Sequence, residues 1–255
     1  GIQQYVGEDV RVLYAEGCHL YKDKVEFLAE KRDRFAEAVI AAEQADIVVM
    51  CLGLDATIEG EEGDAGNEYA SGDKPDLRLP GLQQALLECI VETGKPVVLV
   101  LAAGSAIDLS WAQEHVDAIL DIWYPGARGG MAVAEVLFGK YSPCGKLPVT
   151  FYKDTEKLPD FCDYSMKERT YRYSNTNTRY PFGYGLLYSK VTYHNSSVDC
   201  EVSKMTEMVK VTTEVSNEGD YPVHEGVQVY VKFAEAPEGA PGYQLKGITS
   251  VALKP

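Results

Sequence analysis

The first half of the chain alternates short apolar runs with amphipathic stretches. Continuous apolar runs that are rich in β-branched residues and end in glycine predict strands buried on both faces. The stretches between them place their apolar residues on one side of a helix. This alternation predicts an α/β fold, a layered sandwich with a mainly parallel sheet. The expected strands are 9–17, 45–53, 96–104 and 118–126, and the expected helices are 34–45, 80–95, 110–117 and 129–139.

The pattern changes after about Tyr188, where polar and apolar residues alternate between turn residues. Strict alternation of this kind predicts half-buried antiparallel strands. The expected strands are 190–200, 208–217 and 225–236, with a turn at 217–220. An immunoglobulin-like or fibronectin-type sandwich needs about seven strands, and this stretch has room for only four or five. The sequence therefore predicts a partial all-β module after the α/β domain.

An acidic loop, Thr57 to Lys74, follows the 45–53 strand. It carries six carboxylates between Glu59 and Asp73, with no lysine or arginine among them. The loop 124–130 follows the 118–126 strand, and ligands of parallel sheets bind outside the carboxyl ends of the strands. Both loops are therefore expected at one edge of the sheet. The acidic loop is either a solvated insertion or the source of a general acid, because crowded carboxylates perturb one another's protonation.

Two other kinds of site fit these loops poorly. A calcium loop needs oxygen ligands at alternate positions, and the spacing of Glu59, Glu61 and Glu62 does not provide them. The glycines of 126–130 could form a phosphate cradle, but no GxGxxG or GxxxxGK[ST] motif accompanies them, so a tight strand-to-helix turn is favoured. The four histidines are scattered and form no ligand set. We expect no metal and no organic cofactor.

The net charge limits the classes of partner, and the cysteines bear on the cellular location. The formal net charge of −15 argues against nucleic acid and anionic membranes as partners. No apolar run approaches the roughly 20 residues of a membrane span. The six cysteines show no CxxC pair, and Cys51 and Cys89 lie in apolar runs, where buried free thiols are common. Reduced cysteines predict a cytoplasmic protein. Secretion stays open, because the first residues read as a chain that starts inside a domain.

Several long stretches resemble glycoside hydrolase family 3, the family of many β-glucosidases and β-xylosidases. They are LRLPGLQQALLECIVETGKPVVLVLAAGSAIDLSWA, AILDIWYPGARGGMAVAEVLFGKYSPCGKLPVTF, YSMKERTYRY and YPFGYGLLY. The resemblance runs from about Asp9 to Tyr188, and the remainder is similar to the fibronectin-like domain that often follows. It implies an α/β sandwich domain at 1–187 and a fibronectin type III-like domain at 188–255, both truncated. A (β/α)8 barrel, which carries the aspartate nucleophile in this family, is absent.

The resemblance also implies roles for residues of the acidic loop. The family often has Glu-Gly and then, two residues later, Gly-Asp, which here is Glu59 to Asp64. Glu59 is thus the first choice for the catalytic acid/base and Glu61 the second. Asp64 is a candidate for a substrate contact. Trp123 and Tyr124, outside this loop, are further candidates, because they end a strand near the same edge and their aromatic rings could stack on a sugar. Ala65 and Glu168 depart from the arginine and glycine that are common at these places.

The implied function is part of an exo-acting retaining β-glycosidase that hydrolyses terminal non-reducing sugars. Its partners would be an oligosaccharide or aryl β-glycoside and its own barrel domain, and the isolated chain is expected to be inactive. The first alternative is a non-catalytic module that supports the barrel and shapes the sugar site. The second, more remote, is a nucleotide-binding α/β domain.

Overall fold

The computed structural model describes residues 1–24, 26–55, 58–59, 74, 76–154, 156–173, 177–199 and 209–255. The chain forms two compact units. The first comprises Gly1–Ala134, Phe151–Leu158 and Asn177–Arg179, and the second comprises Glu135–Thr150, Pro159–Thr176 and Tyr180–Pro255.

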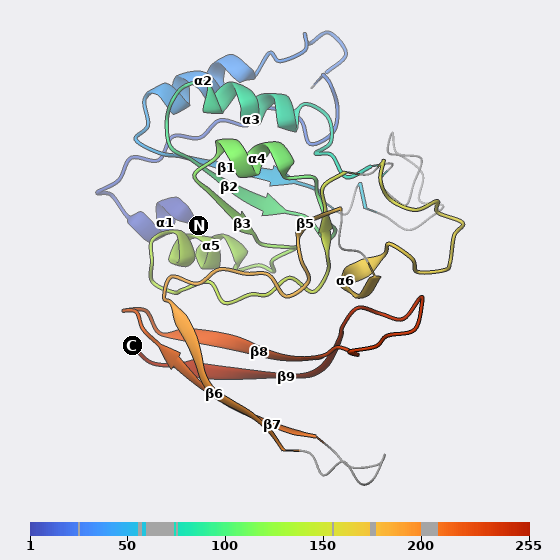
Figure 1. Cartoon of the computed structure of the whole chain (residues 1–255). Coiled ribbons are helices and arrows are strands. Elements are labelled where there is room, and N and C mark those ends of the chain that lie inside the picture. The colour runs from blue at the N-terminus through green and yellow to red at the C-terminus, as the bar shows by residue number, and fades with distance from the viewer. Residues whose placement is uncertain are drawn as a thin grey trace. The chain divides into compact units, whose positions relative to one another are not determined.

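A three-stranded parallel sheet forms the centre of the first unit (Figure 1). Its strands are β1 (Val48–Gly53), β2 (Val97–Ala102) and β3 (Ala118–Asp121), in the order β1-β2-β3. Val48 lies opposite Val97, and Val98 lies opposite Ala118. The middle strand β2 is the most deeply buried, with Leu99 and Leu101 fully inaccessible. The parallel sheet predicted from the apolar runs is confirmed.

Helices pack beside this sheet. They are α1 (Ile2–Val6), α2 (Phe35–Glu43), α3 (Gln83–Val91), α4 (Ser110–His115) and α5 (Gly129–Leu137), the last of which ends in the second unit. Helix α3 contacts β1 and α2, and α4 contacts β3. Leu86, Leu87 and Ile90 of α3 are buried, because they form the apolar side of that helix.

Two local predictions are wrong. Residues 9–17 form no strand, and Val10, Val12 and Tyr14 stay exposed. An apolar stretch forms a sheet strand only where another strand edge pairs with it, and no described strand does so here. Cys51 is exposed and Cys89 only half-buried. Cys51 faces away from its buried neighbours Met50 and Leu52, because successive side chains of a strand point to opposite faces and β1 is covered on one of them.

Two antiparallel strand pairs lie in the second unit. Strand β6 (Val191–Asp199) pairs with β7 (Lys210–Asn217), and β8 (Val223–Val231) pairs with β9 (Gln244–Leu253) (Figure 1). The all-β character predicted for this part of the chain is confirmed. The sequence did not predict the short pair β4 (Phe151–Tyr152) and β5 (Thr178–Tyr180) or the one-turn helix α6 (Thr170–Tyr173).

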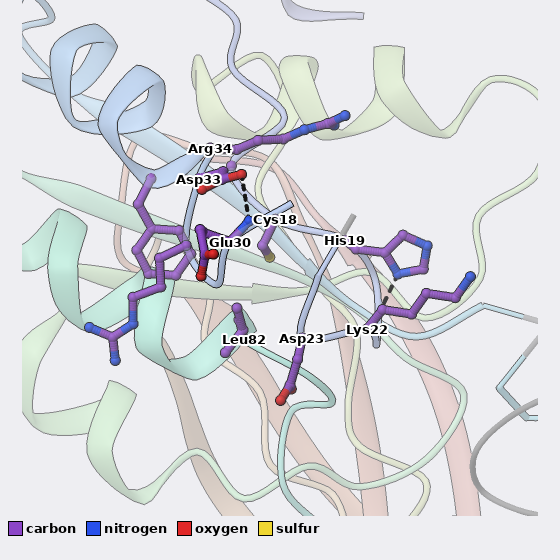
Figure 2. A pocket seen from close by; sticks show the side chains of 11 residues that line it. Cys18, His19, Lys22, Asp23, Glu30, Asp33, Arg34 and Leu82 are labelled. Carbon is purple, nitrogen blue, oxygen red and sulfur yellow. Dashed lines mark hydrogen bonds between the residues drawn. The ribbon is translucent and has the colours of Figure 1, made fainter. Parts of the chain in front are cut away.

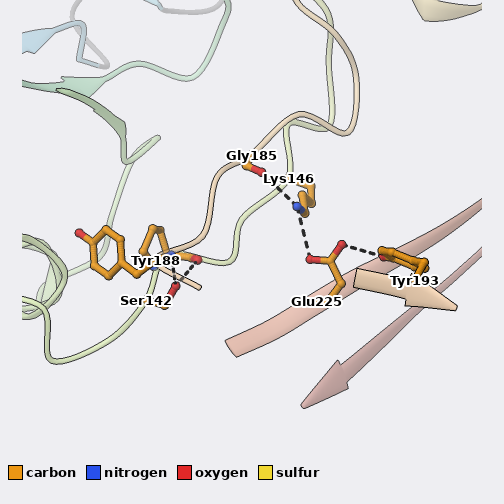
Figure 3. Close-up of polar contacts among 7 residues, drawn as sticks. Ser142, Lys146, Gly185, Tyr188, Tyr193 and Glu225 are labelled. Carbon is orange, nitrogen blue, oxygen red and sulfur yellow. Dashed lines mark hydrogen bonds and ion pairs between the residues drawn. The ribbon is translucent and has the colours of Figure 1, made fainter. Parts of the chain in front are cut away.

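A buried carboxylate contacts side chains from two other segments of the second unit (Figure 3). Glu225 on β8 lies 3.4 Å from the ammonium of Lys146 and accepts a 2.7 Å hydrogen bond from the hydroxyl of Tyr193 on β6. Lys146 also donates to the carbonyl of Gly185 at 3.1 Å. The side chain of Glu225 is only 9% exposed. Its charge is therefore balanced by a cation inside the unit.

Candidate functional site

The carboxyl ends of the three parallel strands bring their following loops to one edge of the sheet, as expected for such sheets. Ile58 and Glu59 follow β1, Gly104 and Ser105 follow β2, and Tyr124 follows β3. These side chains and backbone groups meet in one polar cluster, which we call the edge cluster: Glu59, Gly104, Ser105 and Tyr124.

The carboxylate of Glu59 is the centre of the edge cluster. The hydroxyl of Ser105 donates a hydrogen bond to Oε1, and the hydroxyl of Tyr124 donates one to Oε2. Both donors are neutral. Among the described residues Glu59 has no ion pair, since the ammonium of Lys74, which senses its charge, donates instead to the carbonyl of Ala106 at 2.9 Å. Glu59 is thus oriented at both oxygens, and no cation in the described part of the chain forms an ion pair with it.

Gly104 allows this close approach. A Cβ atom at Gly104 would lie 2.6 Å from Cε2 of Tyr124 and 3.1 Å from Oε2 of Glu59. No side chain fits there without displacing the ring. The ring of Tyr124 is therefore packed against the backbone that follows β2 while its hydroxyl donates to Glu59.

The pKa of Tyr124 is raised, first by burial of its hydroxyl and then by the hydrogen bond to Glu59. The phenol consequently remains protonated and keeps a proton to donate. The residue as a whole is 47% exposed, so its ring is also open to a ligand. The sequence proposed Tyr124 as a substrate contact, and the structure adds its bond to Glu59.

Residues before Glu59 anchor the end of β1. The side-chain amide of Gln83 on α3 accepts from the N–H of Gly53 and donates to its carbonyl, both at 2.7 Å. Gly53 has a φ of 140°, and a Cβ there would lie 1.9 Å from the carbonyl oxygen of Ala102. Ile58 is fully buried, and the N–H of Glu59 donates to the carbonyl of Asp55 at 3.1 Å. The start of the acidic loop is therefore fixed to the sheet.

The other described end of the acidic loop is attached at the same place. Lys74 donates to the carbonyl of Ala106, one residue beyond Ser105. Burial lowers the pKa of Lys74, while the charges of Glu59 and Asp76 act in the opposite direction. Glu59 and Lys74 thus both contact the segment 105–106. Glu61 and Asp64, which the sequence also proposed for the site, lie outside the described residues.

Trp123 belongs to the same edge but has a different neighbour. Its φ is 52°, in the left-handed region that non-glycine residues rarely adopt. Its backbone N–H donates to Oδ1 of Asp121 at 3.2 Å. Burial raises the pKa of Asp121. The side chain of Trp123 is half-buried. The structure brings Tyr124 to Glu59 and attaches Trp123 to Asp121.

Gly104, Ser105 and Lys74 are members of this region that sequence reasoning missed. A signal was present, because Gly104 and Ser105 directly follow the predicted 96–104 strand. The rule that selected the loops after the first and third strands selects this loop equally. The glycines of 126–130 form the tight turn that the sequence favoured: the N–H of Gly129 donates to the carbonyl of Gly126 at 2.8 Å, and a Cβ at Gly129 would lie 2.4 Å from Pro125.

Other polar groups serve local structure. The guanidinium of Arg169 donates to the carbonyls of Pro159, Asp160 and Asp163 within the second unit. A hollow lined by residues of 17–35 and Leu82 has room on the order of one water molecule. Figure 2 shows charges of both signs around it, and the Nδ1 atom of His19 accepts from the N–H of Lys22. This hollow is too small for a sugar.

Three or more His, Cys, Asp or Glu residues close enough to hold a metal ion do not occur in the part of the chain that the structure describes. Within the same residues, no helix combines the length and apolar character needed to cross a membrane.

Comparison with known proteins decides the family. Residues 1–188 match the model of the glycosyl hydrolase family 3 C-terminal domain. The chain belongs to glycoside hydrolase family 3. Its edge cluster is therefore part of a family 3 C-terminal domain, and the resemblance seen in the sequence is confirmed.

Individual relatives agree with this family. The chain is 38% identical to a xylan 1,4-β-xylosidase of Xylanibacter ruminicola, with 91% of this chain and 26% of the relative covered. It is 34% identical to a periplasmic β-glucosidase of Salmonella typhimurium, covering 100% of this chain and 35% of the relative. A solved β-glucosidase structure from Erythrobacter marinus has a TM-score of 0.82 and 32% identity, covering 100% of this chain and 36% of that one. The chain thus spans about a quarter to a third of these family 3 proteins.

Proposed function

We propose that this chain is part of an exo-acting retaining β-glycosidase, a β-glucosidase or β-xylosidase, that hydrolyses terminal non-reducing β-linked sugars. The observation that carries the proposal is the carboxylate of Glu59, held by two neutral hydroxyls at the carboxyl edge of the sheet. Membership of family 3 and relatives named β-xylosidase and β-glucosidase support it.

In the proposed reaction Glu59 is the acid/base, with Glu61 as second choice. The nucleophile is an aspartate of a (β/α)8 barrel outside this chain, about 5–5.5 Å from the acid/base carboxyl. First, protonated Glu59 gives its proton to the glycosidic oxygen as the bond to the anomeric carbon breaks and the aspartate bonds to that carbon. Then Glu59, now a carboxylate, takes a proton from water as the water oxygen displaces the aspartate.

The two hydroxyls suit a group that changes its protonation state. Serine and tyrosine hydroxyls can donate to a carboxylate, and they can accept from a carboxylic acid after rotation of the O–H bond. A lysine in the same place would favour the ionised form alone. We propose that Tyr124, Trp123 and Asp64 contact the sugar. No step of this reaction requires a metal or an organic cofactor.

A second candidate function has a specific observation in its favour. Both carboxylate oxygens of Glu59 already have a donor, so Glu59 can instead serve to anchor the acidic loop. The domain would then shape the sugar site and support the barrel without donating a catalytic group. Apo enzymes often hold catalytic groups in arrangements that change when substrate binds, so this contact pattern is compatible with both roles.

We propose residues 1–187 as the α/β sandwich domain and 188–255 as part of a fibronectin type III-like domain; the match over 1–188 supports the first boundary. Because the nucleophile lies elsewhere, the isolated chain should hydrolyse no aryl β-glycoside. The cytoplasmic location stays a prediction. It is supported by free thiols at all five cysteines that the structure describes, whereas one relative is named periplasmic.

The test uses a full-length enzyme that contains this chain, as wild type, Glu59→Ala and Glu61→Ala. Each is assayed on aryl β-glucosides and β-xylosides with good and poor leaving groups, with and without azide. If Glu59 is the acid/base, Glu59→Ala loses about 10²–10⁴-fold in kcat on poor leaving groups, and azide restores turnover of good ones. The same pattern in Glu61→Ala alone transfers the role to Glu61. If both variants turn over like wild type, the anchoring role is correct.

A further inference from the structure

We propose that the two hydroxyl partners of Glu59 have different tasks. Tyr124 is a fixed positioning residue that keeps Oε2 throughout the reaction, and Ser105 is an exchangeable partner that releases Oε1 to the glycosidic oxygen. The proton that Glu59 transfers is therefore carried on Oε1. This inference rests on the proposed function, because it assigns the working oxygen of the acid/base named there.

Tyr124 has little freedom to leave Glu59. Its hydroxyl donates to Oε2, and its ring lies so close to Gly104 that even a methyl group there would overlap with it. The preceding residue, Trp123, is in the left-handed region, and its backbone N–H donates to Oδ1 of Asp121. The ring is thus held by packing on one side and by the backbone that precedes it.

Ser105 has the opposite character. Its hydroxyl is carried on a single carbon and reaches a different staggered position by rotation about χ1, with no movement of the backbone. The Ser105 hydroxyl donates a hydrogen bond to Oε1 of Glu59. A sugar oxygen that approaches Oε1 can displace this hydroxyl at the cost of one hydrogen bond, about 1 kcal/mol net. Displacing Tyr124 from Oε2 would require its ring to leave its packing against Gly104.

Proton transfer through Oε1 keeps the arrangement balanced. In the first step the Oε1–H bond breaks and a new O–H bond forms on the leaving oxygen. The bond between that oxygen and the anomeric carbon breaks as a carboxylate oxygen of the aspartate nucleophile bonds to the carbon. The negative charge that appears on Glu59 is met by the phenol O–H, which is already directed at Oε2. In the second step Oε1 takes the proton of the attacking water, and Tyr124 again needs no movement.

The experiment compares Tyr124→Phe, Ser105→Ala, Ser105→Thr and Glu59→Gln in the full-length enzyme. Tyr193→Phe removes the hydroxyl that donates to Glu225, and Ser110→Ala removes a serine hydroxyl that donates to the carbonyl of Lys153, so these serve as matched controls. The values of kcat and KM are measured on aryl glycosides with poor and good leaving groups. Thermal unfolding of each variant shows that it is folded.

Tyr124→Phe should lose roughly 10–100-fold in kcat with poor leaving groups and only a few-fold with good ones, with KM nearly unchanged. Ser105→Ala should lose only a few-fold, to the same degree for both, and Ser105→Thr should restore the loss. The inference is overturned if Tyr124→Phe and Ser105→Ala lose kcat equally. It is also overturned if the loss of kcat in Tyr124→Phe is the same for poor and good leaving groups. If Glu59→Gln itself shows no leaving-group dependence, the proposed function fails and the inference fails with it. If kcat of Glu59→Gln depends on the leaving group and Tyr124→Phe has the kcat of wild type, the inference is wrong and the proposed function stands.

Discussion

Glu59 and Glu225 are both held by a tyrosine hydroxyl, but their surroundings differ. At Glu59 the tyrosine is Tyr124, the second donor is a serine hydroxyl, and the carboxylate lies half-buried at the edge of the sheet. At Glu225 the tyrosine is Tyr193, the second partner is the ammonium of Lys146, and the carboxylate is almost fully buried. Burial, and then the bonded glutamate, raise the pKa of both tyrosines.

The difference separates a structural carboxylate from one suited to chemistry. A carboxylate buried beside an ammonium belongs to a charge pair, and removal of either partner leaves the other charge buried and uncompensated. A carboxylate between two hydroxyls keeps its hydrogen bonds in either protonation state. Tyrosine contacts alone therefore do not identify a catalytic glutamate. The second partner, cation or hydroxyl, is the feature that distinguishes the two sites.

Removal of the cation should give the largest effect on stability. Lys146→Met leaves the Glu225 carboxylate buried without a counter-charge, which is expected to lower the free energy of unfolding of the second unit by about 3–5 kcal/mol. The double variant Lys146→Met/Glu225→Leu should recover most of this loss, because it buries no charge. Chemical denaturation of the whole chain, followed by a probe in the second unit, measures both variants. Glu59→Gln is the comparison, with an expected loss of about 1 kcal/mol or less. An equally large loss there would remove the distinction between the two sites.

A methyl group at Gly104 should disturb the edge cluster next. The added Cβ would lie 2.6 Å from the Tyr124 ring, so Gly104→Ala must displace that ring and is expected to cost about 1–3 kcal/mol. Gly126→Ala is the matched control, because no atom lies within 4 Å of a Cβ placed there. Thermal unfolding compares the two variants with wild type. If both variants unfold alike, the ring is not packed against Gly104 in solution.

The spacing of apolar residues was sufficient to predict the architecture of this molecule. The arrangement of the site depends on side-chain contacts. The apolar runs at 45–53, 96–104 and 118–126 were sufficient to predict the parallel sheet, because burial of such runs imposes their pattern on the sequence. The same rules failed at 9–17, because no strand among the described residues pairs with this stretch. The strand ends predicted that the acidic loop and Tyr124 lie at one edge, and the resemblance to the family selected Glu59 within that loop. The hydrogen bond between Glu59 and Tyr124, and the place of Ser105 beside them, depend on side-chain geometry that no spacing in the sequence encodes.

The tyrosines should also separate on titration with base. The raised pKa values of Tyr124 and Tyr193 mean that both phenols ionise after ordinary exposed tyrosines, whereas the hydrogen bond from Arg172 lowers the pKa of Tyr171, which should ionise early. A pKa that is higher in the folded chain gives stability that is complete below the unfolded value of about 10 and is lost as pH rises through the folded value. Ultraviolet difference titration of Tyr124→Phe and Tyr193→Phe should remove late-ionising phenols. Loss of an early-ionising one from either would contradict the assignment.

Substitution of a third glutamate, Glu168, should change stability the least of the variants considered. Its φ is 57°, a left-handed conformation that costs a residue with a Cβ about 1 kcal/mol and costs glycine almost nothing. Glycine is common at this place in the family that the sequence resembles. Glu168→Gly should therefore leave stability unchanged or raise it by up to about 1 kcal/mol, in thermal unfolding of the whole chain. Glu88→Gly, in helix α3, is the control and should lower stability by about 1 kcal/mol, because glycine weakens a helix interior. If Glu168→Gly is as destabilising as the control, contacts of the Glu168 side chain outweigh its backbone strain, and this glutamate joins Glu225 as one held by its partners.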